Sequence, residues 1–174
     1  MNFLKLILSA IFLIVMSTQS LYAEPSKKKN PLIDAEGFLV SATDSLQDRR
    51  QKRISEEQFI EMAKDKNTIV LDTRSKEKYQ EMHIKNARHL NFSDITKDSL
   101  AKVIPSKKTR VLIYCNNNIA NAPQAFPAKS ASMALNIPTF ITLKKYGYQN
   151  VYELAPLIDI SKAKIQFVGE KVGK

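Results

Sequence analysis

Short apolar runs, each bounded by polar or turn-forming residues, recur along the middle of the chain. Residues 68–72 and 111–115 are continuous β-rich runs of the kind that fills a buried strand, and residues 150–154 have the same character. The intervals between them carry helical signals. Strands that alternate with helices predict a parallel sheet covered by helices on both faces. The pattern therefore predicts an α/β fold of three layers, with a central parallel sheet.

Capping and stop signals place the helices. Ser55 and Gln58 have the spacing of a capping box, which predicts a helix that begins after Ser55. Asn136 is expected to be the N-cap of a later helix, with a proline in its first turn, and Gly147 is expected to end that helix. The same kinds of signal predict helices over 75–81, 98–104 and 161–167 and a short strand over 87–92.

The first 23 residues have the pattern of a secretory signal peptide. Lys5 precedes a short apolar run, and a more polar stretch ends at Ala23. The run is shorter than the roughly 18–20 residues that span a bilayer, so we expect cleavage after Ala23 rather than a retained anchor, which is the alternative. The protein is then exported, to the periplasm if the source is a Gram-negative bacterium, with no membrane span after cleavage.

The remaining chain is interpreted as one domain with an extension. Residues 24–53 form an N-terminal extension, because their apolar content is too small for a separate core. Within it, residues 32–40 are expected to pack against the domain and residues 43–52 to be helical. The domain itself covers 54–160, and residues 161–174 form a C-terminal helix or tail.

The chain is basic, with a formal net charge of +10 at pH 7. Basic clusters occur at 27–29, 49–53 and 107–110. They lack interleaved aromatic residues and any nucleic-acid motif, which favours a solvated basic surface over nucleic-acid binding. Attraction of small anionic substrates by this basic surface is a further alternative.

Cys115 is the sole cysteine, so an exported form has no internal disulfide. It directly follows an apolar strand, and ligands bind at the carboxyl ends of the strands in open α/β sheets. N–H groups of the polar loop that follows would lower the pKa of its thiol, as a nucleophile requires. The alternative is a buried, inert side chain. About twenty irregular residues follow Cys115, and so long a loop in a compact domain favours a functional role.

Three blocks in the chain resemble a rhodanese-like domain. The first holds Asp72, Arg74, Glu77 and Tyr79, followed by His83-Ile84, Ala87 and Asn91; the second is the strand that ends in Cys115; the third is residues 146–154. The resemblance covers roughly residues 54–159. It implies the three-layer α/β/α rhodanese fold and a Cys115 that carries sulfane sulfur as a persulfide, with no cofactor or metal.

The resemblance also implies roles for individual residues. Arg74 and Glu77 would form a structural ion pair, and His83 would be a structural element rather than a catalytic base or metal ligand. Asp72 is a candidate to face the substrate pocket.

This sequence departs from the family pattern after the cysteine. Asn116, Asn117 and Asn118 replace a glycine pattern, and residues 120–135 are an insertion. Asparagine tolerates a left-handed backbone, so these three residues are candidates for an amide cradle that binds substrate. Lys129 is the only cation of the insertion and a candidate to bind an anionic donor such as a thiosulfonate. The related dual-specificity phosphatases need an arginine six residues after the cysteine, where this chain has Asn121, so phosphoryl chemistry is not expected.

These observations predict a sulfurtransferase. Cys115 would take sulfur from a thiosulfate or persulfide donor, a small sulfur-containing substrate, and pass it to cyanide or a thiol, a protein thiol included. The first alternative is a catalytically inactive rhodanese-fold module that binds a protein partner through the long loop after Cys115. The second is a redox or persulfide sensor, whose mixed disulfides would have to be intermolecular.

Overall fold

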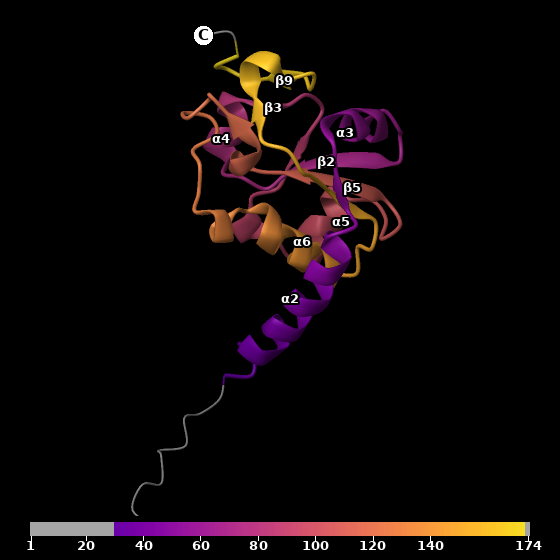
Figure 1. Cartoon of the computed structure of the whole chain (residues 1–174). Helices are drawn as coiled ribbons and strands as arrows, with labels where there is room; N and C mark the ends of the chain where they lie inside the picture. Colours follow the sequence, from indigo (N-terminus) through magenta and orange to yellow (C-terminus); the bar gives the residue numbers. More distant parts are fainter. Residues whose placement is uncertain (1–29, 173–174) are drawn as a thin grey trace, which may run out of the picture. The chain divides into compact units, whose positions relative to one another are not determined.

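The computed structural model describes residues 30–172, and the predicted signal peptide, residues 1–23, lies outside the described residues. Its centre is a five-stranded sheet with the order β1-β7-β5-β2-β4, in which every neighbouring pair is parallel. Figure 1 shows its strands β2 and β5 side by side. The predicted α/β fold with a central parallel sheet is confirmed. The strands are β1 (Arg53–Ile54), β2 (Thr68–Asp72), β4 (Arg88–His89), β5 (Arg110–Tyr114) and β7 (Val151–Leu154).

Two small strand pairs lie outside this sheet. Strands β3 (His83–Ile84) and β9 (Phe167–Val168) pair antiparallel, and β6 (Ile119–Ala120) pairs parallel with β8 (Ile158–Asp159). The α-helices are α2 (Ala35–Arg49), α3 (Glu56–Ala63), α4 (Lys76–Glu81), α5 (Lys97–Val103) and α6 (Asn136–Lys145). Short 3-10 helices are η2 (Phe92–Asp94), η3 (Asn116–Asn118), η4 (Ala131–Met133) and η5 (Ile160–Lys162).

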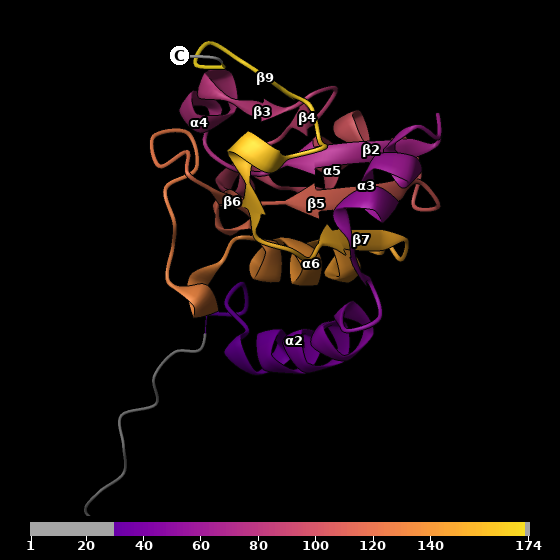
Figure 2. The same ribbon diagram turned by 45° about the horizontal axis from the view of Figure 1, so that its top comes forward.

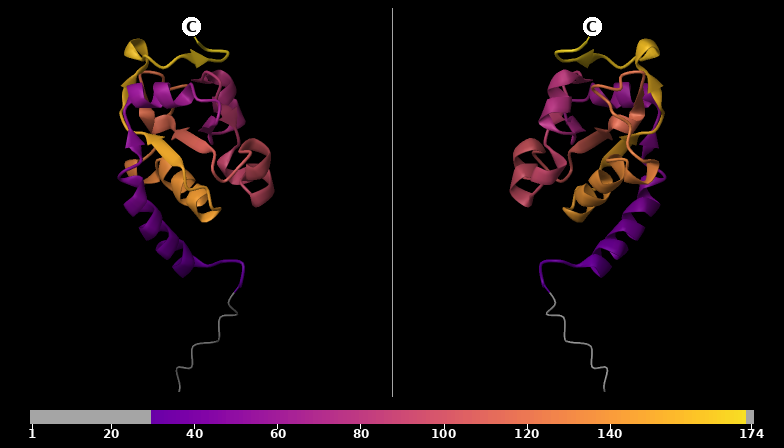
Figure 3. Two further views of the ribbon diagram at one scale, coloured as in Figure 1. Left: turned by 90° about the vertical axis from the view of Figure 1, so that its right-hand side faces the viewer. Right: turned by 90° about the vertical axis from the view of Figure 1, so that its left-hand side faces the viewer.

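Alternation along the strands divides the core into two apolar clusters, one on each face of the sheet. On β5, Leu112 and Tyr114 join the cluster that contains Phe59 of α3, while Val111 and Ile113 join the cluster of α5 and α6. Figures 2 and 3 show strands β2, β5 and β7 side by side, with α3 on one side and α5 and α6 on the other. Side chains at odd-numbered positions near the end of β5 therefore face α6.

Several local signals act as expected. The capping box closes at the start of α3, where Gln58 N donates to Ser55 Oγ at 3.2 Å and Ser55 N donates to Gln58 Oε1 at 3.0 Å. Gly147 follows the end of α6 with a φ of 88°, in the left-handed region that glycine enters without a steric penalty.

Other expectations are wrong. No α-helix forms over 161–167: the chain ends the 3-10 helix η5 at Lys162 and then enters β9, where Phe167 packs edge-on against Phe126 at a ring distance of 5.8 Å. The strand expected over 87–92 is limited to β4. Asn136 is the first residue of α6 rather than its N-cap, because its side chain bonds to Asn118 instead of the helix backbone.

The N-terminal extension also differs from expectation. Helix α2 begins at Ala35, earlier than predicted, and ends at Arg49. Phe38 and Leu39 do not pack into the domain, since they are 55% and 64% exposed. No helix in the described part of the chain is long and apolar enough to cross a membrane.

Candidate active site

Cys115 follows β5 directly and keeps an extended backbone, with φ −146° and ψ −174°. Alternation after Ile113 directs its side chain toward the face of the sheet that α6 covers. Chain reversal into η3 follows at once. The sulfur therefore lies between the end of a strand, a 3-10 turn and the start of a helix.

Main-chain N–H groups from two segments converge on Cys115 Sγ. One segment is η3, next in the chain, and the other is the first turn of α6, across the insertion. The donors are the N–H groups of Asn117, Leu135 and Asn136. The N–H group of Asn118 donates to Cys115 O at 3.1 Å. Such a ring of amides, with the positive end of a helix dipole, stabilises an anionic sulfur. The donor N–H groups, from η3 and from the start of α6, make up the amide cradle; that the cradle binds substrate stays a prediction.

The expected backbone of the three asparagines is wrong. Asn116, Asn117 and Asn118 form a 3-10 helix instead of a left-handed turn, and the left-handed residue of this region is Asn121, with a φ of 63°. A 3-10 turn directs successive N–H groups back toward the residue that precedes it, so Cys115 receives them without a glycine.

Asn118 joins the two halves of the cradle. Its Oδ1 accepts from Cys115 N at 2.9 Å and from Asn136 Nδ2 at 2.9 Å. Its Nδ2 donates to Leu154 O at 2.8 Å and to Pro156 O at 3.2 Å. The side chain is thus committed to the protein and holds β5, α6 and the end of β7 together, rather than presenting a free donor to substrate.

The sulfur itself is covered, since Cys115 is 1% exposed. Burial raises the pKa of the Cys115 thiol above its ordinary value of 9.0; the N–H groups of Asn136 and Asn117 oppose this, and the charge of Glu153 adds to it. The expectation of a lowered pKa is wrong for this conformation, because the loss of water outweighs the amides.

The side chain of Asn117 forms hydrogen bonds with the main chain of Lys129, not with its side chain. Asn117 Nδ2 donates to Lys129 O at 2.8 Å, and Lys129 N donates to Asn117 Oδ1 at 3.0 Å. This reciprocal pair fastens the insertion to η3. The side chain of Lys129 is exposed, and its proposed contact with an anionic donor stays a prediction. Asn116 is buried, and its Oδ1 finds no hydrogen-bond partner within residues 30–172.

Asp72 does not face a pocket, because it is fully buried in an ion pair with Arg74. Arg74 Nη2 lies 2.6 Å from Asp72 Oδ2, and the hydroxyl of Tyr114 donates to the same oxygen. Burial, reinforced by the charge of Asp72, raises the pKa of Tyr114 well above its ordinary value, so the phenol stays a donor. Arg74 Nε also donates to the Asp72 carboxylate, Nη2 donates to Met82 O at 2.7 Å, and Nη1 donates to Ala125 O at 2.8 Å.

The ion pair expected between Arg74 and Glu77 is therefore wrong. Arg74 is buried beneath the insertion, whereas the Glu77 carboxylate is exposed and lies 3.4 Å from Lys78 Nζ. His83 stacks on Tyr79 with ring centres 3.7 Å apart, and its Nδ1 lies 2.7 Å from Tyr79 O. These contacts hold the His83 ring against Tyr79, and the structural role that the resemblance implies for it stays a prediction.

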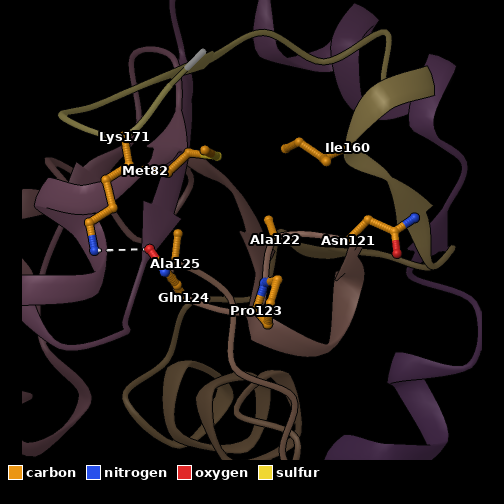
Figure 4. Close-up of a pocket in the computed structure, with 8 residues that line it drawn as sticks. All are labelled: Met82, Asn121, Ala122, Pro123, Gln124, Ala125, Ile160 and Lys171. Atoms are coloured by element: carbon orange, nitrogen blue, oxygen red, sulfur yellow. Dashed lines mark hydrogen bonds between the residues drawn. The ribbon is translucent and has the colours of Figure 1, made fainter. Parts of the chain in front are cut away.

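A pocket of about 620 Å³ lies beside the first part of the insertion (Figure 4). Two of its polar side chains are already paired, since Lys171 Nζ lies 2.6 Å from Glu81 Oε1 and 3.4 Å from Gln124 Oε1. Cys115 is not among its lining residues, which are Met82, Asn121, Ala122, Pro123, Gln124, Ala125, Ile160 and Lys171. The pocket is therefore separate from the sulfur.

Comparison with known families gives a match to the rhodanese-like domain over residues 55–155. The chain belongs to the rhodanese-like domain family. The thiosulfate sulfurtransferase GlpE of Coxiella burnetii is 31% identical to it over 103 residues, which cover 59% of this chain and 79% of that protein. This rhodanese-like domain is therefore homologous to a sulfurtransferase.

Solved structures of other rhodanese-like proteins are also similar to this chain. The rhodanese-like domain of an Anabaena protein is 17% identical, with a TM-score of 0.49, and the alignment covers 71% of this chain and 83% of that one. A rhodanese from E. coli, solved with anions, is 23% identical, with a TM-score of 0.39 and coverage of 59% and 99%.

Sequence reasoning missed parts of this rhodanese-like site that come from distant segments. Leu135 and Asn136 supply amides to the sulfur across the insertion, and Glu153 supplies a buried charge near it. The sequence does indicate a polar contact at Asn136, since an asparagine at the start of a helix offers a polar side chain. It does not indicate that the partner of this side chain is Asn118. Glu153 lay inside an apolar strand, where a carboxylate needs a partner.

Proposed function

We propose that this protein is a sulfurtransferase in which Cys115 accepts sulfane sulfur and passes it to a thiophilic acceptor. The single observation that carries the proposal is the convergence of main-chain N–H groups from η3 and α6 on Cys115 Sγ. Family membership and the homology to a thiosulfate sulfurtransferase support it. Amides of this kind stabilise a negative sulfur, which both the attacking thiolate and the persulfide carry.

The proposed reaction has two transfers. The Cys115 thiolate attacks the outer sulfur of thiosulfate, an S–S bond forms, the donor's own S–S bond breaks, and sulfite leaves with the electron pair. The resulting persulfide anion lies in the amide cradle. A nucleophile such as cyanide or a thiolate then takes the terminal sulfur, and the electron pair returns to Cys115 as thiolate. No net oxidation of the protein occurs, so no redox cofactor takes part.

Access to the sulfur is the step that the geometry makes demanding. Cys115 is 1% exposed, so a donor reaches Sγ only after the chain around it opens locally. Residues 128–133 are exposed and are fastened to η3 through the reciprocal bonds of Asn117 with Lys129. Release of this contact is a direct way to uncover η3 while β5 and α6 stay packed.

Thiocyanate formation from thiosulfate and cyanide tests the proposal. We expect turnover by the wild-type protein and none by Cys115→Ser, which keeps the size of the side chain but lacks the thiolate. Intact-mass measurement after treatment with a polysulfide donor is expected to show one added sulfur on the wild type and none on the variant. Absence of both signals across thiosulfate, thiosulfonate and persulfide donors contradicts the proposal.

The buried, high-pKa thiol also motivates a second candidate, an inactive rhodanese-fold module that binds a protein partner. Cys115 would then be a core residue, and the insertion, with Met133 71% exposed, would be the contact surface. The two candidates differ in the reactivity of the thiol in the folded protein. A thiol that resists alkylation at neutral pH as completely as a core cysteine supports the module. Alkylation of Cys115, with a product heavier by one sulfur atom after prior treatment with a persulfide donor, supports the enzyme.

A further inference from the structure

A buried carboxylate lies near the proposed nucleophile. Glu153 is 3% exposed on β7, and its register partner on β5 is Ile113, two residues before Cys115. Because Ile113 and Cys115 point to the same face of the sheet, and neighbouring residues of parallel strands share a face, Glu153 and Cys115 lie on the same side. The negative charge of Glu153 opposes formation of the Cys115 thiolate.

The main counter-charge of Glu153 comes from the N-terminal extension. Arg49, in the last turn of α2, forms a two-pronged ion pair with this carboxylate: Nη2 donates to Oε1 at 2.6 Å, and Nε donates to Oε2. A bidentate guanidinium–carboxylate pair of this kind fixes both partners. Arg49 lies before residue 55, where the match to the rhodanese-like domain begins.

We propose that Arg49 is a positioning residue of the sulfur site, which neutralises Glu153 and so permits a negative charge on Cys115. This role rests on the proposed function, because it matters only if Cys115 reacts as an anion. It gives helix α2 a part in the chemistry, although no residue of α2 touches the sulfur. Removal of Arg49 leaves a buried negative charge close to the place where a second one has to form.

The other charges around Glu153 make smaller contributions. Arg53, from β1, places Nε 3.7 Å from Glu153 Oε1, but its side chain is 46% exposed and its Nη2 donates to Ala155 O at 3.3 Å. Lys144, from α6, is paired at 2.8 Å with Asp48. The fork of Arg49 is therefore the contact whose loss changes the charge at Glu153.

The Asp48–Lys144 pair also supplies a matched control. Asp48 precedes Arg49 on α2 and ties the same helix to the domain through a different partner. Asp48→Asn weakens the attachment of α2 without a change in the charge of Glu153. A purely structural role for the extension predicts that Asp48→Asn and Arg49→Gln have similar effects on the sulfur.

The test measures the pKa of Cys115. The ultraviolet absorbance of the thiolate is recorded against pH, and Cys115→Ser serves as the spectroscopic reference. We expect Arg49→Gln to raise this pKa by about one unit. Glu153→Gln is expected to lower it. The double variant Arg49→Gln, Glu153→Gln lacks both charges and is expected to stay near the wild-type value, because the two charges cancel in the wild type. Arg49→Lys and Asp48→Asn are expected to stay near the wild-type value.

Two results overturn the inference: an unchanged pKa of Cys115 in folded Arg49→Gln, or a pKa in the double variant that is as high as in Arg49→Gln. If Arg49→Gln fails to fold, the double variant still decides, because it holds no buried unpaired carboxylate. Its pKa of Cys115 is expected to lie above that of Glu153→Gln, and an equal pKa in the two variants overturns the inference. The readout needs no turnover. Failure of sulfur transfer by the wild type therefore contradicts the proposed function and leaves the titration result standing.

Discussion

Replacement of Asn118 by alanine removes the side chain that holds the sulfur site together. Asn118 is 5% exposed, and its amide accepts from Cys115 N and Asn136 Nδ2 and donates to Leu154 O. Each buried partner left without a hydrogen bond costs about 1–3 kcal/mol. Water that enters the space offsets part of this. We expect a loss of roughly 3 kcal/mol in the free energy of unfolding, and at least about a tenfold loss in sulfur transfer, because the α6 amides move away from Sγ.

Urea denaturation and the thiocyanate assay measure the two effects, with Asn116→Ala as the matched control. Asn116 is also a buried asparagine of η3, but its side-chain oxygen has no hydrogen-bond partner within residues 30–172. Its truncation is expected to cost less than about 1 kcal/mol. Asn118→Asp keeps the acceptor for Cys115 N but loses the donors to Leu154 and Pro156, and its added charge raises the pKa of Cys115.

The reasoning is refuted if Asn116→Ala and Asn118→Ala lose the same stability. It is also refuted if Asn118→Ala unfolds at the same urea concentration as the wild type. A stability loss without any change in the Cys115 pKa or in sulfur transfer contradicts the role of Asn118 in holding α6 at the sulfur, and leaves it a packing residue.

Three further outcomes are expected. Because burial raises the pKa of Cys115, the rate of the first sulfur transfer increases with pH through the neutral range, without a plateau below pH 9, and a plateau near pH 7 contradicts this. Asp72→Asn leaves Arg74 charged and buried, and lowers the free energy of unfolding by about 3–5 kcal/mol in urea titrations; a loss below 1 kcal/mol contradicts the importance of the pair. Gly169→Ala places a Cβ 2.6 Å from Glu81 O at a φ of +139°, which strains the pairing of β3 with β9. Amides of β3 and β9 are therefore expected to exchange hydrogen faster than in the wild type, while those of β5 do not. An equal change in exchange rate in all three strands contradicts this.

The features that sequence reasoning found are those with local signals. The continuous apolar run of β5, the capping box of Ser55 and Gln58, and the glycine after α6 depend on residues a few positions apart. Cys115 was identified because it directly follows such a run. Its position at the end of β5 needed no long-range information, whereas the amides of Leu135 and Asn136 come from a distant segment.

The features that sequence reasoning missed depend on contacts between distant segments. The sequence predicts that Asp72 faces a pocket and that Arg74 forms an ion pair with Glu77. Both predictions are wrong, because nothing near these residues in the sequence indicates that the insertion covers Arg74 and that Ala125 O accepts a hydrogen bond from it. The raised pKa of Cys115 is another case. Burial of the sulfur depends on how several segments close over it, and no residue near position 115 indicates the extent of that closure.

The insertion raises the question of how a cradle survives when its two halves are moved apart in the chain. Asn118 and Asn136 are 18 residues apart, and each doubling of loop length adds only about 0.6 kcal/mol of closure entropy. Relative to a loop of a few residues, the insertion thus costs about 1 kcal/mol. A buried hydrogen bond contributes about the same amount, and Asn136 Nδ2 makes one to Asn118 Oδ1. The side chain of Asn118 therefore offsets the closure entropy of the longer loop. It holds the first turn of α6 at the sulfur, which is the task of a short glycine-containing loop in the family pattern.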